Sequence, residues 1–420
     1  MYLRLILMKV MIHMKNEFSL HDICSVSNGF EDDRFVGIKL SSGKPEVHFP
    51  IGFSIFSSND ELREDIVTLI KVLKRFFYSE INNNLKQSGN VNENRFPLLA
   101  YQRILLRYLN YGQYFETETE YTAFPSGKID WSRTIKKNIP SFSEQGAVYL
   151  ETTSKKSKLK SESLISKIFD YCVYYAFQNI GWLYTNKKFP IPEIKFNKQL
   201  FLSAVSEKLN TENNDSRKEL FSDMLEIISD QSNRGVTTAD RLYGTFEFEY
   251  VWEKIIDCAF GELNKKIYFP HTYWKIEKDG TQTVNHALEP DTIMKAFGNA
   301  YVIDAKYYRY GSSNNSNHLP ASSSIHKQIT YGEYIANNPN FQFGKVYNAF
   351  LLPADLQSNT NKSDGFFSCF GVAVSDWKDG SNPYETVAGI FADTKGLMKC
   401  YSEKKRLSKE LALLISSQIV

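Results

Sequence analysis

The spacing of hydrophobic residues changes from a two-residue period to a helical period within the first hundred positions. Residues 34–56 contain two alternating segments, FVGIKL and EVHFPIGF, and the SSGKP between them favours a turn, which predicts a β-hairpin. Between Ile66 and Leu73 the apolar residues recur at helical spacing, and Asp60 is a candidate N-cap. A second amphipathic helix is expected from Pro97, a residue suited to a first helical turn.

The middle of the chain is expected to hold a long buried helix. Residues 164–184 are apolar and aromatic throughout, and a strand is expected from Gly146. The segment KKSKLK at 155–160 is expected to be a solvated loop, with a phosphate contact as the alternative. The first 18 residues are expected to form a first strand or an extension ahead of a later start.

After Gly235 the pattern indicates a mixed α/β core. Apolar residues at helical spacing predict a helix over 246–261, and a short strand follows Pro290. The apolar run Tyr301–Ile303 is bounded by charge, which is typical of a buried strand. A mobile, low-complexity loop is expected over 311–324.

The remaining C-terminal residues complete that core. A helix is expected from Ser324, which is also its candidate cap. The segments KVYNAFLLP and FFSCFGVAVS predict two apolar strands, and a final helix is expected from about Ser402. The order of helices and strands is that of a mixed sheet flanked by helices.

Length and composition set the class of protein. A chain of 420 residues suggests two or three domains, and its 42% hydrophobic and 14% aromatic content excludes a disordered chain. The formal charge of +2 argues neither for nor against nucleic acid. Five scattered cysteines without a CxxC pair indicate reduced thiols and no structural zinc. We recognise no membrane span or targeting signal, so a cytoplasmic protein without membrane contact is expected.

These patterns divide the chain into three consecutive segments. Residues 1–120 are expected to form an N-terminal β-rich and helical domain. Residues 121–235 are expected to be a linker followed by a helical region. Residues 236–420 are expected to form the mixed α/β domain, and this last segment carries the candidate chemistry.

Three charged residues of the last segment have the pattern of a metal-dependent hydrolase. Asp291 opens the strand after Pro290, and Asp304 and Lys306 follow at the end of the next, apolar strand. Because strand residues two apart share a face, Asp304 and Lys306 point the same way, and a hairpin brings Asp291 to Asp304. Carboxylate oxygens hold Mg²⁺, which activates water for phosphodiester hydrolysis, and a lysine beside that water offsets charge.

Each part of this pattern is common by itself. An isolated Asp-x-Lys at a strand end is usually ordinary surface, and Pro-Asp is an ordinary turn signal. Their spacing and the apolar strand before Asp304 together favour a site. The upstream helix adds Glu249 and Glu253, four residues apart on one face. Either glutamate completes the site, or the pair is a solvated helix face.

The elements Pro290-Asp291 and Ile303-Asp-Ala-Lys306, with a glutamate on the upstream helix, resemble the PD-(D/E)XK nuclease superfamily. More narrowly, the chain resembles the McrC-like subunits of LlaJI-type restriction systems. Three further segments carry that resemblance, which covers roughly residues 120–340: VWEKII at 251–256, GKIDWSRTIKKNIP at 127–140, and the glutamine–tyrosine helix at 327–331. Gln328 and Tyr331 are three apart where the family has four, which leaves the role of Tyr331 open.

The resemblance implies an endodeoxyribonuclease with a PD-(D/E)XK core. Asp291, Asp304 and Glu253 would hold Mg²⁺, for which Mn²⁺ would substitute, and Lys306 would orient the attacking water. Gln328 would steady the site or touch the DNA backbone. Glu253 is preferred to Glu249 because Trp-Glu-Lys-Ile-Ile matches the family motif better.

The resemblance also implies partners. Duplex DNA would be the substrate, and an McrB-like AAA+ NTPase would be the motor that delivers it, docking on residues 1–120. From its residues alone, Gly127–Arg133 is expected to be a structural hinge, with a DNA contact as the alternative, and Trp131 is expected to pack in a core. Tyr307–Tyr310 would contact DNA or simply extend the strand. Two other functions stay open: a non-catalytic DNA- or motor-binding adaptor with a nuclease-like fold, and a stand-alone repair nuclease.

Overall fold

The computed structural model describes most of the chain and divides it into two compact units. The described residues are 19–30, 33–41, 44–55, 58–82, 96–123, 127–143, 146–160, 162–233, 240–278, 280–357 and 365–419. The strand or extension expected within residues 1–18 lies outside them. Of the described residues, those at 96–233 form one unit, and those at 19–82 join those from 240 onward in the other. No helix among the described residues is long and apolar enough to cross a membrane.

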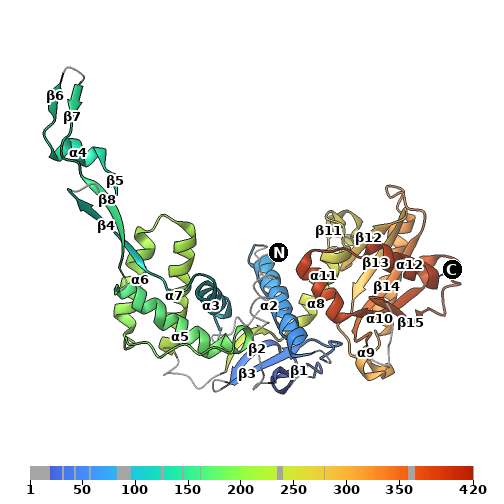
Figure 1. Ribbon diagram of the computed structural model, residues 1–420. Coiled ribbons are helices and arrows are strands. Elements are labelled where there is room, and N and C mark those ends of the chain that lie inside the picture. Colours follow the sequence, from blue (N-terminus) through green and yellow to red (C-terminus); the bar gives the residue numbers. More distant parts are fainter. Residues whose placement is uncertain are drawn as a thin grey trace. The chain divides into compact units, whose positions relative to one another are not determined.

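The first unit contains a group of packed helices (Figure 1). Its main helices are α3 (Leu98–Tyr111), α5 (Leu164–Tyr184), α6 (Lys198–Thr211) and α7 (Asp215–Asn233). The buried helix predicted at 164–184 is confirmed, and the Ser163 side chain caps it by accepting the Ser166 N–H. The guanidinium of Arg103 on α3 donates to the buried carboxylate of Asp223 on α7. That charge pair fixes the two helices to each other.

The same unit carries an arm, defined here as residues 116–160 and drawn at the upper left of Figure 1. The arm consists of β4 (Glu116–Thr122), β5 (Lys128–Ile129), α4 (Trp131–Lys137), β6 (Ser141–Ser143), β7 (Gly146–Val148) and β8 (Ser154–Lys160). The prediction of a loop at KKSKLK was wrong, because β8 pairs with the acidic strand β4. Glu118 and Glu120 lie opposite Lys158 and Lys156 in that antiparallel pair. Opposite charges on paired strands stabilise an otherwise solvated ribbon.

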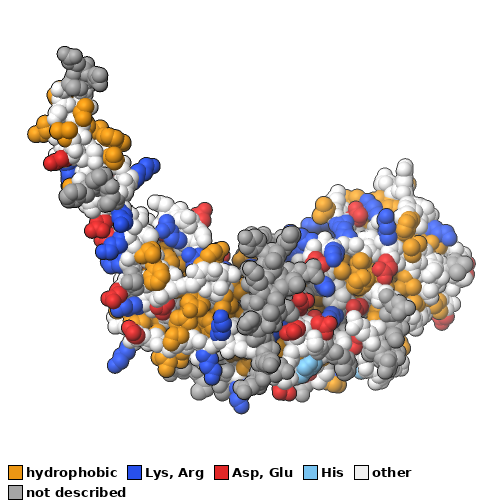
Figure 2. Space-filling view, in the orientation of Figure 1, with side chains coloured by type: hydrophobic (Ala, Val, Ile, Leu, Met, Phe, Trp, Pro, Cys, Tyr) orange, Lys and Arg blue, Asp and Glu red, His pale blue; other side chains and the backbone are white. Residues whose placement is uncertain are grey.

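Large apolar side chains of the arm are exposed, and Figure 2 shows hydrophobic side chains gathered on it. The expectation of core packing for Trp131 was wrong, since it is 55% exposed. Asp130 caps α4 by accepting the Arg133 N–H, and the Arg133 guanidinium lies 3.5 Å from the centre of the Tyr121 ring. The motif at 127–140 therefore builds a local turn and helix. The arm's apolar tip, as we call it, is formed by Trp131, Ile135, Ile139, Phe142 and Leu150.

The second unit begins with a four-stranded sheet and a long helix. Its elements are η1 (Leu20–Ile23), β1 (Cys24–Val26), β2 (Val36–Ser41), β3 (Lys44–Phe49), α2 (Asn59–Asn82) and β9 (Arg241–Thr245). The predicted hairpin is confirmed as the antiparallel pair β2–β3. Asp60 lies inside α2, and Ser58 is the capping residue: its Oγ accepts the Glu61 N–H, and Glu61 in return accepts the Ser58 N–H.

The rest of the second unit is a mixed α/β fold. Its elements are α8 (Phe248–Phe260), η3 (Lys265–Tyr268), β10 (Tyr273–Lys275), β11 (Gln282–Val284), β12 (Thr292–Ala296), β13 (Asn299–Ala305), α9 (Tyr310–Ser313), η4 (Ser316–His318), α10 (Ser322–Asn337), β14 (Val346–Ala354), β15 (Phe367–Ala373), η5 (Pro383–Glu385), β16 (Val387–Asp393), α11 (Thr394–Glu403) and α12 (Ser408–Gln418). The strand order is β12-β13-β14-β16-β15. The inner pairs β13–β14 and β14–β16 are parallel, whereas the outer pairs β12–β13 and β15–β16 are antiparallel.

The helices around this sheet bury it. Ile329 and Ile335 of α10 pack against β13, β14 and β16, in the same two apolar clusters as Val302 and Phe350. Helix α8 contacts β12 and β13, and α12 contacts β12, β14, β15 and β16 (Figure 1). Since β13 and β14 are buried along almost their whole length, the polar Asp304 at the end of β13 needs a specific reason to be there.

Several elements differ from those predicted. Residues 311–324 are not one loop, because α9 ends there, η4 lies within it and α10 already begins at Ser322. Helix α10 has Ala321 as its N-cap, not Ser324. Strand β16 and helix α11 were missed, and the last helix begins at Ser408.

Candidate active site

Asp291 and Asp304 stand at the same end of the β12–β13 hairpin. The register pairs Thr292 with Ile303, so the next position along brings Asp291 opposite Asp304. The Asp291 Oδ2 accepts a 2.9 Å hydrogen bond from the main-chain N–H of Ala305. The expectation that this hairpin brings the two carboxylates together is confirmed.

The Asp291 carboxyl group is held where its charge is unfavourable. Its pKa is raised to about 8, first by burial and then by its interactions with the neighbouring carboxylates of Asp304 and Glu253, against the lowering effect of the hydrogen bond from Ala305. Asp304 is itself only 9% exposed. The hairpin end therefore concentrates negative charge, which a bound cation would neutralise.

Lys306 supplies a cation that pairs directly with the Asp304 carboxylate. Its Nζ lies 2.5 Å from Asp304 Oδ2, which confirms that the two side chains share a face. Burial lowers the pKa of Lys306, but the charge of Asp304 and the hydrogen bond to it outweigh burial, so the pKa is raised overall. The main-chain N–H of Lys306 donates to Leu351 O at 2.9 Å, which fixes the residue to β14. Lys306 therefore stays charged beside Asp304.

Helix α8 presents two glutamates with different surroundings. Burial raises the pKa of Glu253, the charge of Asp304 raises it further, and Lys306 opposes both. Glu249, one turn earlier, forms an ion pair with Arg34 at 3.2 Å. Glu253 is thus the glutamate that interacts with the aspartates, whereas Glu249 is already paired.

Gln328 is buried below the carboxylates of the site and supports the strand that carries Asp304. Its side chain is 1% exposed, and Nε2 donates a 2.7 Å hydrogen bond to Val302 O, two residues before Asp304. Tyr331 is 1% exposed and packs in the apolar cluster that includes Val302. Both side chains therefore join α10 to β13, and through β13 they help to position Asp304.

Two residues close to the site were missed in the sequence. Lys265 Nζ lies 2.8 Å from Asp257 Oδ1 and also donates to the main-chain oxygen of Asp291. The signal was present, because Asp257 follows Glu253 by four residues and so continues the acidic stripe of α8. The pair fixes the start of β12, and with it Asp291, to that helix.

These side chains are suited to a divalent cation with oxygen ligands. Asp291, Asp304 and Glu253 offer carboxylate oxygens, the donors that Mg²⁺ and Mn²⁺ take, and their mutual repulsion is relieved by such an ion. Within the described part of the chain, no group of three or more His, Cys, Asp and Glu side chains is already arranged as a metal cage. The fit therefore rests on the aspartate pair, with Glu253 as the third charge.

A cavity of about 540 Å³ opens beside these residues. Glu253 and Lys306 line it, together with Arg34, Arg309 and His318. The segment Tyr307–Tyr310 was expected either to contact DNA or to extend the strand, and its residues differ in this respect. Tyr307 is a buried structural residue whose hydroxyl accepts the Ile51 N–H at 2.9 Å, whereas Arg309 faces the cavity.

The sequence comparisons with known proteins point to restriction enzymes. The family model described as LlaJI restriction endonuclease matches residues 35–375. The type II restriction enzyme BsuMI component YdjA of Bacillus subtilis (strain 168) is 27% identical over 329 residues, which are 73% of this chain and 67% of that protein. One chain of a solved assembly of Thermococcus gammatolerans McrB AAA+ hexamers with bound McrC also aligns with this chain, at 13% identity and a TM-score of 0.36. The alignment covers 90% of this chain and 83% of that one. Because the family model spans most of the sequence, the chain belongs to the LlaJI restriction endonuclease family.

Proposed function

We propose that the chain is the DNA-cutting subunit of a restriction system, a Mg²⁺-dependent endodeoxyribonuclease whose second unit is a PD-(D/E)XK-type core. The observation that carries this proposal is the convergence of Asp291, Asp304 and Lys306 at one hairpin end, with Glu253 facing them from α8. Membership of a restriction endonuclease family supports it. The substrate is duplex DNA, and the bond cut is a phosphodiester.

The work of cleavage divides among these residues. Asp291, Asp304 and Glu253 would hold the divalent cation, which would activate water and offset charge on the phosphate. Lys306 is held by the Asp304 carboxylate and by the Leu351 carbonyl, and its ammonium would offset charge beside the attacking water. Gln328 keeps β13 in place from below through Val302. Lys265 does the same for Asp291 through its main-chain oxygen.

We propose that an AAA+ NTPase motor delivers the DNA. Support comes from the likeness of GKIDWSRTIKKNIP to the motif of McrC-like subunits, and from the apolar tip of the arm, to which this motif contributes. Ile139 is 92% exposed and Phe142 82%. Exposed apolar clusters of this kind mark protein-binding surfaces. We therefore propose the arm as the docking surface, in place of the docking on residues 1–120 expected from the resemblance.

The catalytic part is tested by metal-dependent cleavage of duplex DNA with the motor subunit present. Asp304→Ala and Lys306→Met should each abolish cleavage while leaving the unfolding transition intact, because both side chains lie at the reacting centre. The exposed Asp376→Asn is the matched control and should cut as the wild type does. Calorimetry with Mn²⁺ separates the alternatives. A wild-type protein that binds DNA but does not bind metal and does not cut would be the non-catalytic adaptor. Cleavage in the absence of the motor would favour a stand-alone nuclease.

A further inference from the structure

The cavity beside the candidate site has a cationic wall that the cleavage chemistry does not use. Arg309 and His318 come from the segments after β13, and Arg34 comes from the segment before β2. Glu253 and Lys306 line the same cavity of about 540 Å³. A phosphate next to the one being cut would therefore lie within reach of this wall.

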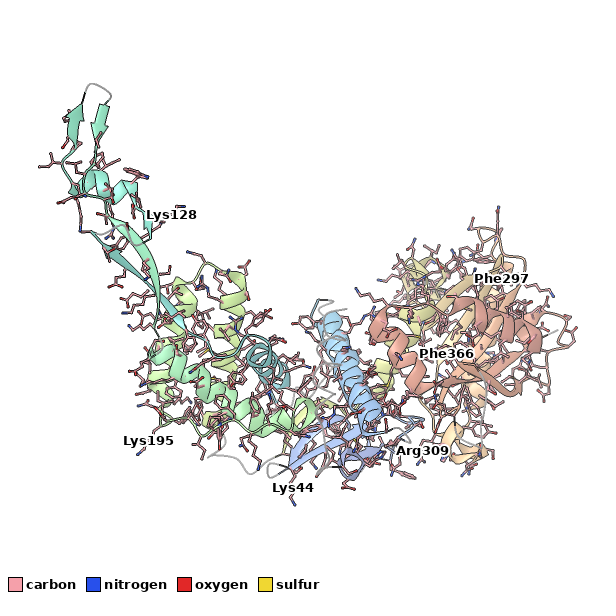
Figure 3. The ribbon with its side chains drawn as sticks, viewed as in Figure 1. Lys44, Lys128, Lys195, Phe297, Arg309 and Phe366 are labelled. Carbon is pink, nitrogen blue, oxygen red and sulfur yellow. The ribbon has the colours of Figure 1, made fainter. Side chains whose placement is uncertain are left out.

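Arg309 is held in place on both sides of its guanidinium. Its Cζ lies 3.6 Å from the centre of the Phe30 ring, and its Nη2 lies 2.9 Å from His318 Nε2. Figure 3 labels Arg309 close to the N-terminal strands of this unit. Stacking on an aromatic face restrains a guanidinium in one plane, which leaves its edge free to donate.

The chain around Gly29 is shaped to fit the Arg309 side chain. Gly29 has φ +73°, and a Cβ added there would lie 3.4 Å from Arg309 Cδ and 2.8 Å from Ile51 Cδ1. A larger residue would therefore be strained and would crowd Ile51. Ile51 is itself anchored, because its N–H donates to the Tyr307 hydroxyl and its carbonyl accepts from Thr394. The wall is thus built on fixed main chain.

His318 contacts Arg309 as a neutral ring. Arginine only donates, so His318 Nε2 accepts and the ring proton sits on Nδ1, which donates to Ser313 Oγ at 2.6 Å. The other acceptor near the guanidinium is Asn28 O, at 3.5 Å. A guanidinium has five N–H donors, so donors remain for a ligand.

The two arginines of this wall differ in charge balance. Arg34 is neutralised by Glu249 at 3.2 Å. For Arg309, no carboxylate within the described part of the chain forms an ion pair. An arginine that lines a cavity, is rigidly held and lacks an anionic partner is complementary to an anion, and its planar fork matches phosphate oxygens.

We propose that Arg309 binds a non-bridging oxygen of a DNA backbone phosphate beside the bond that is cut, with Phe30 and His318 holding the guanidinium toward the cavity. This subsite rests on the proposed DNA-cutting function. It positions the strand so that the neighbouring phosphodiester reaches the carboxylates. The contact carries no sequence information, so it serves every DNA sequence equally.

The subsite is tested by DNA binding without cleavage. The full chain is titrated with a fluorescent duplex in Ca²⁺, at several salt concentrations. Arg309→Met should weaken binding about tenfold and lower the slope of log Kd against log salt by about one. Lys44→Met removes an exposed lysine from the end of β3 and is the matched control, expected to bind within about twofold of the wild type. Equal binding by Arg309→Met and the wild type would overturn the subsite.

Uncharged methylphosphonate substitutions in the DNA backbone show which phosphate Arg309 contacts. Single methylphosphonates are placed at the three phosphates on each side of the cut, and one of them should weaken the wild type but leave Arg309→Met unaffected. Arg309→Lys keeps charge without the fork, so it should recover part of the affinity; it also serves if the methionine variant fails to fold. If no position distinguishes the proteins, and inorganic phosphate raises the Tm only when Arg309 is present, the site takes free phosphate and the DNA assignment is refuted.

The two proposals can fail separately. A chain that binds DNA through Arg309 and never cuts would refute the proposed cleavage and leave the subsite standing. A chain that cuts DNA while Arg309→Met binds as tightly as the wild type would refute the subsite alone.

Discussion

Asp291 and Ala305 are joined by a 2.9 Å hydrogen bond from the main-chain N–H of Ala305 to the Asp291 carboxylate. This bond ties the residue just before β12 to the last residue of β13, which lies between Asp304 and Lys306 in the sequence. A change in either strand therefore moves both carboxylates together, and the hairpin acts as one positioning unit.

The two glutamates of α8 provide a matched pair for the site. Glu253→Gln should lower cleavage by about a hundredfold or more, because it removes a charge that interacts with Asp304. Glu249→Gln should lower it less than about fivefold, because it breaks only the half-exposed ion pair with Arg34. The measurement is the single-turnover cleavage rate at saturating Mg²⁺. Equal losses for the two variants would contradict the assignment of Glu253.

Local patterns predicted many helices and strands of the second unit, but which segments of the chain belong to that unit depends on pairing between distant strands. The β2–β3 hairpin, α8, β12 and β13 follow from hydrophobic period and turn residues. Contacts group the chain differently from the three consecutive segments expected, because β9 at 241–245 pairs with β2 at 36–40. No local pattern reports a pairing across two hundred residues. Strand β8 was missed because its lysines look like a solvated loop until the acidic residues of its partner β4 are known.

The site was predictable where chemistry follows strand geometry. Asp304 and Lys306 share a face because strand residues alternate, and Asp291 meets Asp304 through hairpin register. The supports were not predictable in the same way. Lys265 reaches Asp291 through a main-chain oxygen, which leaves no side-chain pattern, and Arg309 is recognisable only once Phe30 is seen on its face.

Removing the Lys265 ammonium should loosen the start of β12. Lys265→Met leaves the Asp257 carboxylate and the Asp291 carbonyl without this donor, so the free energy of unfolding should fall by about 1 kcal/mol. Cleavage should fall as well, because Asp291 is less firmly held. Urea unfolding measures the first effect, with the exposed Lys266→Met as control. Identical transitions for both variants would show that the contact contributes nothing.

The raised pKa of Asp291 gives the metal-free protein a specific pH dependence. The folded-state pKa is about 8 against an ordinary value of 3.8, so the folded state binds more protons than the unfolded state between about pH 4 and 8. Stability from this group therefore falls as pH rises through that window, by up to about 1.4 kcal/mol per pH unit. Asp291→Asn removes the titration, so its advantage over the wild type should grow from pH 5 to pH 8.

Urea unfolding in EDTA at several pH values checks this expectation. The comparison with Asp291→Asn isolates the carboxylates of the site, because buried carboxyls outside it, such as Asp223, titrate alike in both proteins. Mg²⁺ should stabilise the wild type more at pH 8 than at pH 6, since binding requires the ionised carboxylate. Parallel curves for wild type and variant would show that Asp291 ionises normally.

The arm's apolar tip should matter for the motor and not for folding. Ile139→Asp and Phe142→Asp alter side chains that are already in water, so the free energy of unfolding should change by less than about 0.5 kcal/mol. If the tip is the docking surface, each charge is placed in an apolar contact and should prevent co-elution with the AAA+ subunit. Leu413→Asp on α12, which also replaces an exposed apolar side chain, is the control and should still co-elute. Retention of the motor by both tip variants would move the docking surface elsewhere, because a buried carboxylate without a partner is too costly for an intact interface to tolerate.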